Sequence, residues 1–476
     1  MSVKYKFINI LIIAFIISSV FSIYLVSSFD IYIELNNFSQ HSMIKGDIYG
    51  YFLNASKLKE QIVNGRNFFS SNLEYTTSYL HPKLLYLFFE LFNINLVENS
   101  SSKIAIDFKK VFFLISQSAF YFFSVFLFIN ELNKIFSKKI VFYTLLFLSF
   151  EISILTFHSS FFTESIFFSL QLLTLTLIIN KDYSIIKFIL LAFVVFFMFL
   201  QRSPSIYYFI IVTIYLLLNM QRKSIVPILT FLLTYFLLVI LFGYQNYKRA
   251  NLFYVTSQLG KVEFYRWLVP DILTLSKDNE KILKDKNLLD NNINQLILSY
   301  DKNVSIDILN SNELLNKVNF HKTEKARVEF SNKVFEYTLD FFKKNKLATL
   351  KTVFKNTLHF AILNPLESTY FFNKFLHKGP KGTGYYKSQS HINSIPMRIV
   401  YTTIIYLICL IGFIEFYKSK KYNLLILMIL SIFYFTAILS WIGMTRYNTP
   451  NIIFLSIFFG LGLNKFTEKI NQLRRK

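Results

Sequence analysis

Five ionisable residues each lie beside an apolar run and are of types that take part in chemistry. They are Asp47 in GDIYGYFLN, His81 in YLHPKLLY, Glu164 in FFTESIFF, Arg202 in LQRSPSIY and Arg446 in GMTRYNTPN. A carboxylate near a hydroxyl can take its proton as a general base. Arginine binds phosphate-like anions through two parallel hydrogen bonds. These residue types suit proton transfer and anion binding, provided that the fold brings them together.

The elements that must position these residues are membrane helices. The chain has 476 residues, of which 53% are hydrophobic, with 57 Phe and 30 Tyr. The apolar residues come in blocks of roughly membrane length, which no soluble domain needs. We therefore predict an all-α polytopic membrane protein with about ten transmembrane helices, interfacial helices and external loops.

The apolar blocks predict ten spans, several of them close to the minimum length for crossing. They lie near 7–29, 110–130, 139–158, 162–180, 185–201, 204–220, 225–245, 397–417, 422–441 and 446–464. The first follows a basic start and resembles a signal peptide. Its long apolar run and lack of a small-residue cleavage site favour a retained signal anchor.

The charges between the spans predict the topology. The formal net charge is +23, and the lysines and arginines gather at the ends of apolar runs. This pattern is better explained by the positive-inside rule than by nucleic-acid binding, so we expect no nucleic-acid partner. It predicts a multi-pass protein of the cell (inner) membrane with both termini cytoplasmic. The cytoplasmic charges are interpreted as plain flanks of the helices.

Two long segments then lie outside the cytoplasm. The first is the external loop 30–109, within an N-terminal transmembrane core of about seven spans at 1–245. The second is a mixed, amphipathic segment at 246–396. The remaining residues, 397–476, supply about three C-terminal transmembrane helices. Lys351, Lys355 and His359 favour an interfacial helix near the end of the second segment.

Each candidate residue also has a structural interpretation. Asp47 could begin a turn or helix, and His81 before a proline could simply introduce an interfacial helix. Glu164 could favour a helix N-terminus through the dipole. Arg202 and Arg446 could be interfacial anchors. A functional role is favoured because all five residues are predicted on the external side of the membrane, where both long segments also lie.

Taken in order, these residues resemble the membrane-embedded glycosyltransferases of the GT-C superfamily, in particular the bacterial protein-mannosyltransferase-like branch. The resemblance consists of an acidic residue in the first external loop, a His-Pro-x-Leu-Tyr-like stretch and a Thr-Glu-Ser element at a helix start. It continues in an Arg-x-Pro-type turn after the fifth span and in TRYNTPN (445–451) at the last span. It covers most of the chain.

The resemblance implies an inverting transfer of a sugar from a polyprenyl-phosphate donor to an extracytoplasmic hydroxyl, with Asp47 as the general base. The acceptor would be a glycan, a lipid or a protein. The residues expected to bind the substrates include two from the stretch FLHKGPKGTG, His377 and Lys378. The others are His81, Glu164, Arg202, Arg446 and Tyr447. A groove between helices would hold the prenyl chain. Because Asp47 has no acidic neighbour, we expect no metal site there, although a metal requirement stays open.

Three alternatives remain. A lipid or sugar transporter or flippase would carry repeats, broken helices and ionisable residues near the midplane, and we detect no repeat. An O-antigen polymerase or ligase would rely on arginines in external loops. A catalytically inactive scaffold of the same fold is the third. Motifs of soluble nucleotide-binding enzymes, zinc proteases and serine hydrolases are absent from the sequence.

Overall fold

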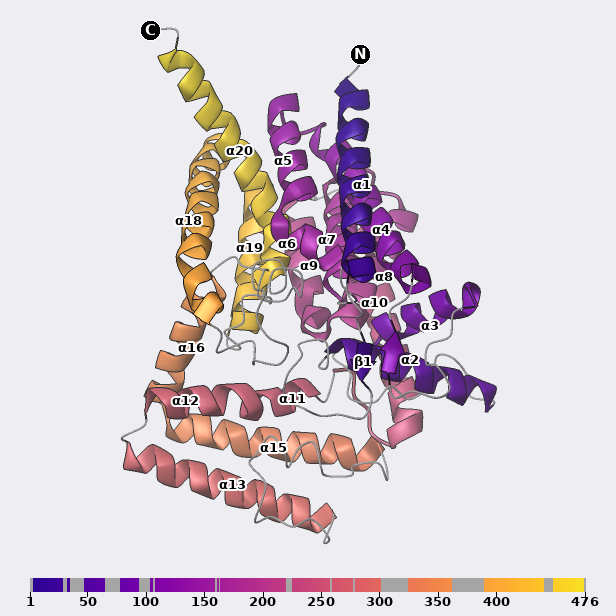
Figure 1. The fold of residues 1–476 in the computed structure, drawn as a ribbon, viewed down its shortest axis with the longest axis vertical. Helices are drawn as coiled ribbons and strands as arrows, with labels where there is room; N and C mark the ends of the chain where they lie inside the picture. Colours follow the sequence, from indigo (N-terminus) through magenta and orange to yellow (C-terminus); the bar gives the residue numbers. More distant parts are fainter. Residues whose placement is uncertain are drawn as a thin grey trace.

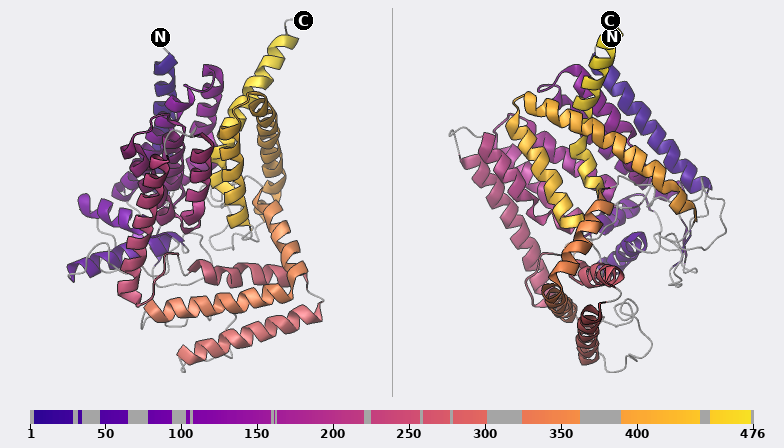
Figure 2. Two further views of the ribbon diagram at one scale, coloured as in Figure 1. Left: turned by 180° about the vertical axis from the view of Figure 1, so that it is seen from behind. Right: turned by 90° about the vertical axis from the view of Figure 1, so that its left-hand side faces the viewer.

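The computed structural model is helical, with its longest helices side by side in a bundle (Figures 1 and 2). The structure describes residues 3–28, 32–34, 47–64, 78–93, 103–105, 108–158, 161, 163–219, 225–256, 259–276, 279–300, 324–361, 389–440 and 448–474. The only strands in these ranges are β1 (Tyr32–Glu34) and β2 (Lys103–Ala105), which pair antiparallel with Ile33 opposite Ile104. This short pair joins the two ends of the first predicted loop, where no strand was expected.

The bundle contains a helix at every predicted span. The first group comprises α1 (Val3–Ser28), α4 (Phe108–Leu132), α5 (Lys138–Phe150), α6 (Ile152–His158), α7 (Glu164–Ile179), α8 (Ile185–Gln201), α9 (Tyr208–Asn219) and α10 (Val226–Ala250). The last group comprises α18 (Gln389–Lys418), α19 (Tyr422–Leu439) and α20 (Thr449–Leu473). A helix satisfies its own backbone hydrogen bonds, which is what an apolar run requires in lipid.

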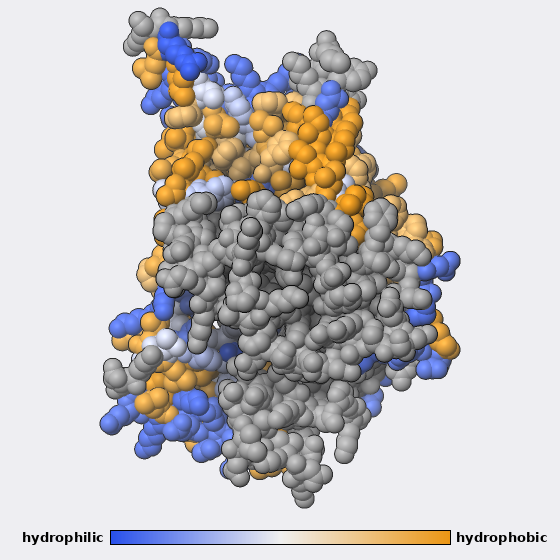
Figure 3. All heavy atoms as spheres, in the orientation of Figure 1, coloured by the Kyte–Doolittle hydropathy of each residue, from blue (hydrophilic) through white to orange (hydrophobic). Residues whose placement is uncertain are grey.

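Four helices of the described chain are long and apolar enough to cross a membrane: Val111–Leu132, Val226–Lys248, Ile399–Lys418 and Tyr422–Leu439. Four further apolar helices are shorter: Phe7–Ile23, Glu164–Ile179, Ile185–Gln201 and Ser203–Asn219. Apolar surface forms a band over the upper half of the molecule, with hydrophilic surface at both ends (Figure 3). The arrangement fits a membrane protein.

The predicted span 139–158 is not one helix. It breaks at Glu151, which is extended (φ −63°, ψ 124°) between α5 and α6. A single carboxylate in a continuous apolar run gives no helix-stop signal of the kind that glycine or proline gives. The break was therefore not predicted.

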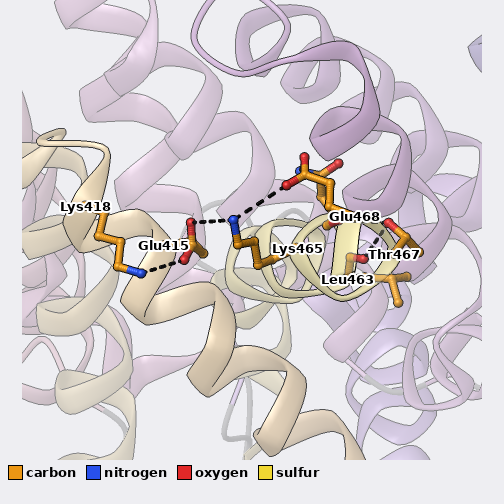
Figure 4. Close-up of polar contacts among 7 residues, drawn as sticks. Glu415, Lys418, Leu463, Lys465, Thr467 and Glu468 are labelled. Atoms are coloured by element: carbon orange, nitrogen blue, oxygen red, sulfur yellow. Dashed lines mark hydrogen bonds and ion pairs between the residues drawn. The ribbon is translucent and has the colours of Figure 1, made fainter. Parts of the chain in front are cut away.

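One hydrophobic core joins the bundle helices, with α7 buried on nearly every side. Glycines bring α18 and α20 into close contact: a Cβ at Gly412 would lie 1.7 Å from Phe458 O, and one at Gly462 would lie 1.9 Å from Ile408 O. Small residues commonly allow such close approach in membrane helices. Near one end of these helices, Glu415 lies 2.9 Å from Lys418 and 4.0 Å from Lys465 (Figure 4).

A layer of helices with its own core runs across one end of the bundle (Figure 1). It comprises α11 (Leu259–Glu263), a π-helical turn Phe264–Leu268, α12 (Val269–Leu275), α13 (Glu280–Tyr300) and α15 (Glu324–Lys344). From it α16 (Lys346–Phe360) returns toward the bundle, where Thr357 Oγ1 donates to Ser440 Oγ at 3.0 Å. The exposed apolar side chains of α16, such as Leu350 and Phe354, accord with the predicted interfacial helix.

The helices α2 (Asp47–Val63) and α3 (His81–Leu91) lie at the same end of the bundle as this layer. The start of α1 and the end of α20 both lie at the opposite end of the bundle, on different sides of it (Figures 1 and 2). We call these the layer end and the termini end.

Candidate functional site

Three of the predicted residues meet at the layer end of the bundle. Glu164 is the first residue of α7, and Arg202 follows the last residue of α8. Arg202 Nη1 lies 3.5 Å from Glu164 Oε1, and the two side chains are 9% and 0% exposed. The Arg202 guanidinium also lies 5.6 Å from the ring centroid of Phe167, one turn along α7. The pair is therefore a buried ion pair and not a pair of independent surface anchors.

The local sequence explains where Arg202 sits. The apolar run of α8 ends at Gln201, and Arg202 takes an extended conformation (φ −143°, ψ 109°). A 3-10 helix, Ser203–Tyr207, follows with Pro204 in its first turn. Proline has no N–H to continue the hydrogen bonds of α8, but it fits the first turn of a new helix, so the chain turns at Arg202. The predicted Arg-x-Pro turn thereby directs Arg202 against the start of α7.

His81 begins α3 and is completely buried. Its Nε2 lies 2.9 Å from Phe161 O, and Gln201 Nε2 lies 3.2 Å from its Nδ1. Gln201 Nε2 also donates to Thr163 O at 3.0 Å. Because an amide NH2 only donates, the network assigns the imidazole proton to Nε2.

Burial lowers the pKa of His81 to about 4, which keeps the ring neutral at physiological pH. Both ring nitrogens are engaged within the protein, so His81 fixes the segment before Glu164 relative to α3. Pro82 in the first turn of α3 fits the structural interpretation as well. The geometry suits His81 to positioning the Glu164–Arg202 pair better than to contacting a substrate.

Asp47 is the first residue of α2, and its side chain lies outside the part of the structure that is described. Tyr51, four residues later, is 2% exposed, and its ring centroid lies 4.9 Å from that of His81. Positions four apart share one face of a helix. The position of Asp47 is thus on the α2 face that packs against His81. A helix start also suits aspartate for structural reasons.

The other predicted site residues, Arg446, Tyr447, His377 and Lys378, lie outside the described residues. The chain resumes one residue after Tyr447, at Asn448. Asn451 Nδ2 donates to Asn448 Oδ1 at 2.8 Å, and Gln171 Nε2 donates to Pro450 O at 3.3 Å. Gln171 lies two turns after Glu164 on α7. The residues directly after the TRY sequence therefore pack against the helix that begins with Glu164.

Sequence reasoning missed a second buried carboxylate. Glu151, at the break between α5 and α6, accepts hydrogen bonds from Ser153 Oγ at 2.7 Å, Tyr401 OH at 2.8 Å and Ile154 N at 3.1 Å. Its side chain links the break between α5 and α6 to Tyr401 within α18. The available signal was one acidic residue inside the apolar run LFLSFEISILTF.

A buried histidine was missed too. His158 ends α6, and its Nδ1 lies 2.7 Å from Ser165 Oγ on α7. Gln117 Nε2 of α4 donates to His158 O at 3.0 Å. These contacts fix α6 against the first turn of α7, next to Glu164.

An apolar groove of about 450 Å³ lies among α18, α19 and α20. Its lining is Tyr406, Cys409, Leu410, Phe413, Ile429, Ile432, Phe433, Thr436, Leu455 and Phe458. Two of its lining residues contact the start of α20: Asn451 Nδ2 donates to Thr436 Oγ1 at 3.0 Å, and Asn448 Nδ2 donates to Tyr406 OH at 3.3 Å. The groove therefore has one polar edge, directly after the TRY sequence.

Among the residues that the structure describes, no group of three or more His, Cys, Asp or Glu is placed to hold a metal ion. No protein-family model matches the chain, and no curated protein sequence matches it.

Proposed function

We propose that this chain is a polytopic inner-membrane glycosyltransferase that uses a polyprenyl-phosphate sugar as donor. In this proposal ten helices cross the bilayer, counting α5 and α6 as one crossing and the 3-10 turn with α9 as another. The termini end is cytoplasmic and the layer end is extracytoplasmic. The observation that carries the proposal is the buried Arg202–Glu164 ion pair, at 3.5 Å, beside His81 and the face of α2 that begins at Asp47.

The reaction would begin at Asp47. Its carboxylate takes the proton of an acceptor hydroxyl, and the hydroxyl oxygen attacks the anomeric carbon. The bond from that carbon to the phosphate oxygen breaks, and its electron pair stays on the polyprenyl phosphate. The transition state has oxocarbenium character, as in other glycosyl transfers. One carboxylate suffices for this chemistry.

Arg202 would stabilise the phosphate on which negative charge develops. A fixed cation at a water-poor site lowers the energy of such a transition state more than a mobile cation in water does. Glu164 holds the guanidinium in place, and the His81–Gln201–Thr163 contacts hold the segment before Glu164. Arg446, Tyr447, His377 and Lys378 are proposed to complete the binding of donor and acceptor.

The groove among α18, α19 and α20 supports a lipid donor. Its lining is apolar apart from the edge at Tyr406 and Thr436, which contacts the start of α20. A prenyl chain in the groove would bring its phosphate toward the residues that follow Arg446. A soluble nucleotide sugar would have no use for such a groove.

Mass spectrometry of cell-surface glycans and lipids, with and without this protein, tests the proposal. We expect one sugar residue to be missing in the absence of the protein, and its identity and attachment would name both donor and acceptor. Unchanged glycans and lipids would contradict the proposal.

Transport is the second candidate, favoured by the broken helix at Glu151. Transporters place ionisable groups at interrupted helices inside the membrane, and Glu151 with Tyr401 matches that pattern. Reconstituted vesicles distinguish the two functions. Flipping of a lipid-linked sugar without transfer to an acceptor would favour transport, whereas transfer without flipping would favour the glycosyltransferase.

A further inference from the structure

A second polar site lies at the termini end of the bundle. A cavity of about 470 Å³ opens there among the α4–α5, α7–α8 and α18–α19 connections and the end of α9. Its lining contains no acidic residue and includes five lysines: Lys134, Lys181, Lys187, Lys420 and Lys421. The positive-inside rule explains why these lysines share one side, but it does not explain why they converge on one cavity.

Two of the lysines are held by neutral groups. Lys187 is only 6% exposed, and its Nζ donates to Asn180 O at 2.6 Å and to Asp182 O. Lys421 Nζ donates to Ile135 O and lies 4.1 Å from the ring centroid of Phe136. Carbonyl oxygens and a ring face orient an ammonium group without cancelling its charge. These contacts therefore leave the charge of both lysines at the cavity.

Two carboxylates near the cavity offset part of its charge. Glu131 pairs with Lys134 at 2.6 Å, at one edge. Asp182 accepts hydrogen bonds from Ser184 N at 3.0 Å and Ser184 Oγ at 2.8 Å, which hold its carboxylate on the side of Ser184 but leave its charge. Five lysines line the cavity, so an excess of positive charge remains for a ligand.

The walls of the cavity are fixed by contacts between elements far apart in the chain. Asn423 Nδ2 donates to Leu218 O at 3.0 Å, which ties α19 to the end of α9. Lys421 ties the α18–α19 connection to the α4–α5 connection. Lys420 itself is left-handed (φ 56°), a conformation that lysine rarely adopts, so the turn is imposed by its surroundings. Contacts within the protein therefore hold the walls of the site in place.

We propose that this cavity binds a phosphate-bearing anion. Lysine ammonium groups commonly bind phosphate, each acting as a point charge, and several of them surround this cavity. The side-chain amides of Asn180, Asn219 and Asn423 also line the cavity and can hydrogen-bond phosphate oxygens. Basic pockets between membrane helices bind the headgroups of anionic lipids, and the same chemistry would accept a soluble phosphate. This site is separate from the proposed transfer site, which lies at the layer end.

Thermal unfolding of the full chain in detergent micelles tests the proposal. The probes are phosphatidylglycerol, zwitterionic phosphatidylcholine, and glycerol 3-phosphate as the soluble headgroup. A ligand of the native state raises the unfolding temperature. If phosphatidylglycerol raises the unfolding temperature and glycerol 3-phosphate does not, the ligand is a lipid. If both raise it, the phosphate group alone is sufficient for binding.

Two matched double variants distinguish the cavity from general surface charge. Lys181→Gln with Lys420→Gln removes two exposed lining charges, and we expect the Kd for phosphatidylglycerol to rise roughly 30-fold. Lys138→Gln with Lys139→Gln removes two exposed lysines of α5 outside the lining, and its Kd should change by less than about threefold. No stabilisation by either anion, or equal weakening in both variants, would overturn the proposal.

Discussion

The two ends of the bundle handle positive charge in different ways. At the layer end, Arg202 is buried and faces Glu164 at 3.5 Å. At the termini end, Lys187 and Lys421 are held by carbonyl oxygens and aromatic rings around an open cavity. The first arrangement fixes a cation in place by pairing it with a buried anion. The second places several cations around one cavity, where an excess of positive charge remains.

The difference separates two uses of charge. A buried ion pair has a large desolvation cost, so it persists where its exact geometry matters. Cations beside a cavity are partly solvated and can exchange water for an anionic ligand. We therefore associate the layer end with fixed, preorganised chemistry and the termini end with reversible anion binding. The following predictions test this contrast, from the largest expected effect to the smallest.

Breaking the buried pair should have the largest effect on stability. Arg202→Met leaves Glu164 as a buried charge without its cation, and we expect the free energy of unfolding to fall by about 3–5 kcal/mol. The double variant Glu164→Leu with Arg202→Met should lose less, because no lone charge remains. Unfolding in detergent measures both.

Arg266 provides the control for that experiment. It is exposed on the helical layer, and Arg266→Met should change stability by only about 0.5 kcal/mol. An equal effect of the Arg202 and Arg266 substitutions would show that the layer end does not depend on a fixed cation.

His81 should make the layer end sensitive to acid. Its folded-state pKa of about 4 lies below the unfolded value of 6.5, so the unfolded chain binds the proton more readily between these values. The free energy of unfolding therefore contains the full contribution of neutral His81 above pH 6.5. It falls by up to ~3 kcal/mol as the pH approaches 4. His81→Gln should remove this part of the pH dependence. An unchanged difference between pH 7 and pH 4 would contradict the buried neutral ring.

The surface network of Figure 4 should contribute least. Glu415, Lys418, Lys465 and Glu468 form contacts of 2.9–4.0 Å, and the lysine side chains are 41–63% exposed. Glu415→Gln should therefore cost at most about 1 kcal/mol, and less in high salt. A loss as large as that from Arg202→Met would mean that exposure does not separate the two kinds of ion pair.

The sequence predicted where the bundle helices lie. The prediction for α8, 185–201, matches Ile185–Gln201 because polar connections bound one continuous apolar run. The sequence could not predict the break at Glu151, because that residue is held by Ser153 and by Tyr401, which is distant in the chain. The helical layer was predicted only as a mixed segment, because α13 and α15 bury their apolar residues in a core of their own.

The candidate site was predicted in the same partial way. Counting spans put Glu164 and Arg202 on one side, and the structure brings them into contact. Their contact depends on how α7 packs against α8, which no local pattern encodes. Gln201 and Ser78 were not identified, although one bonds the His81 ring and the other accepts from His81 N at 3.1 Å. Amide and hydroxyl residues beside apolar runs are too common to single out without the fold.

The most direct test of the central claim is sugar transfer by Asp47→Asn. The assay is release of polyprenyl phosphate by the reconstituted protein, with the donor and acceptor that the glycan comparison identifies. Glu60→Gln is the matched control, since it removes one negative charge from an exposed position of the same helix. We predict that Asp47→Asn slows release by about 10²–10⁴-fold with an unchanged unfolding temperature, while Glu60→Gln retains activity. Release by Asp47→Asn within roughly twofold of the unmodified protein would contradict a general base at this position.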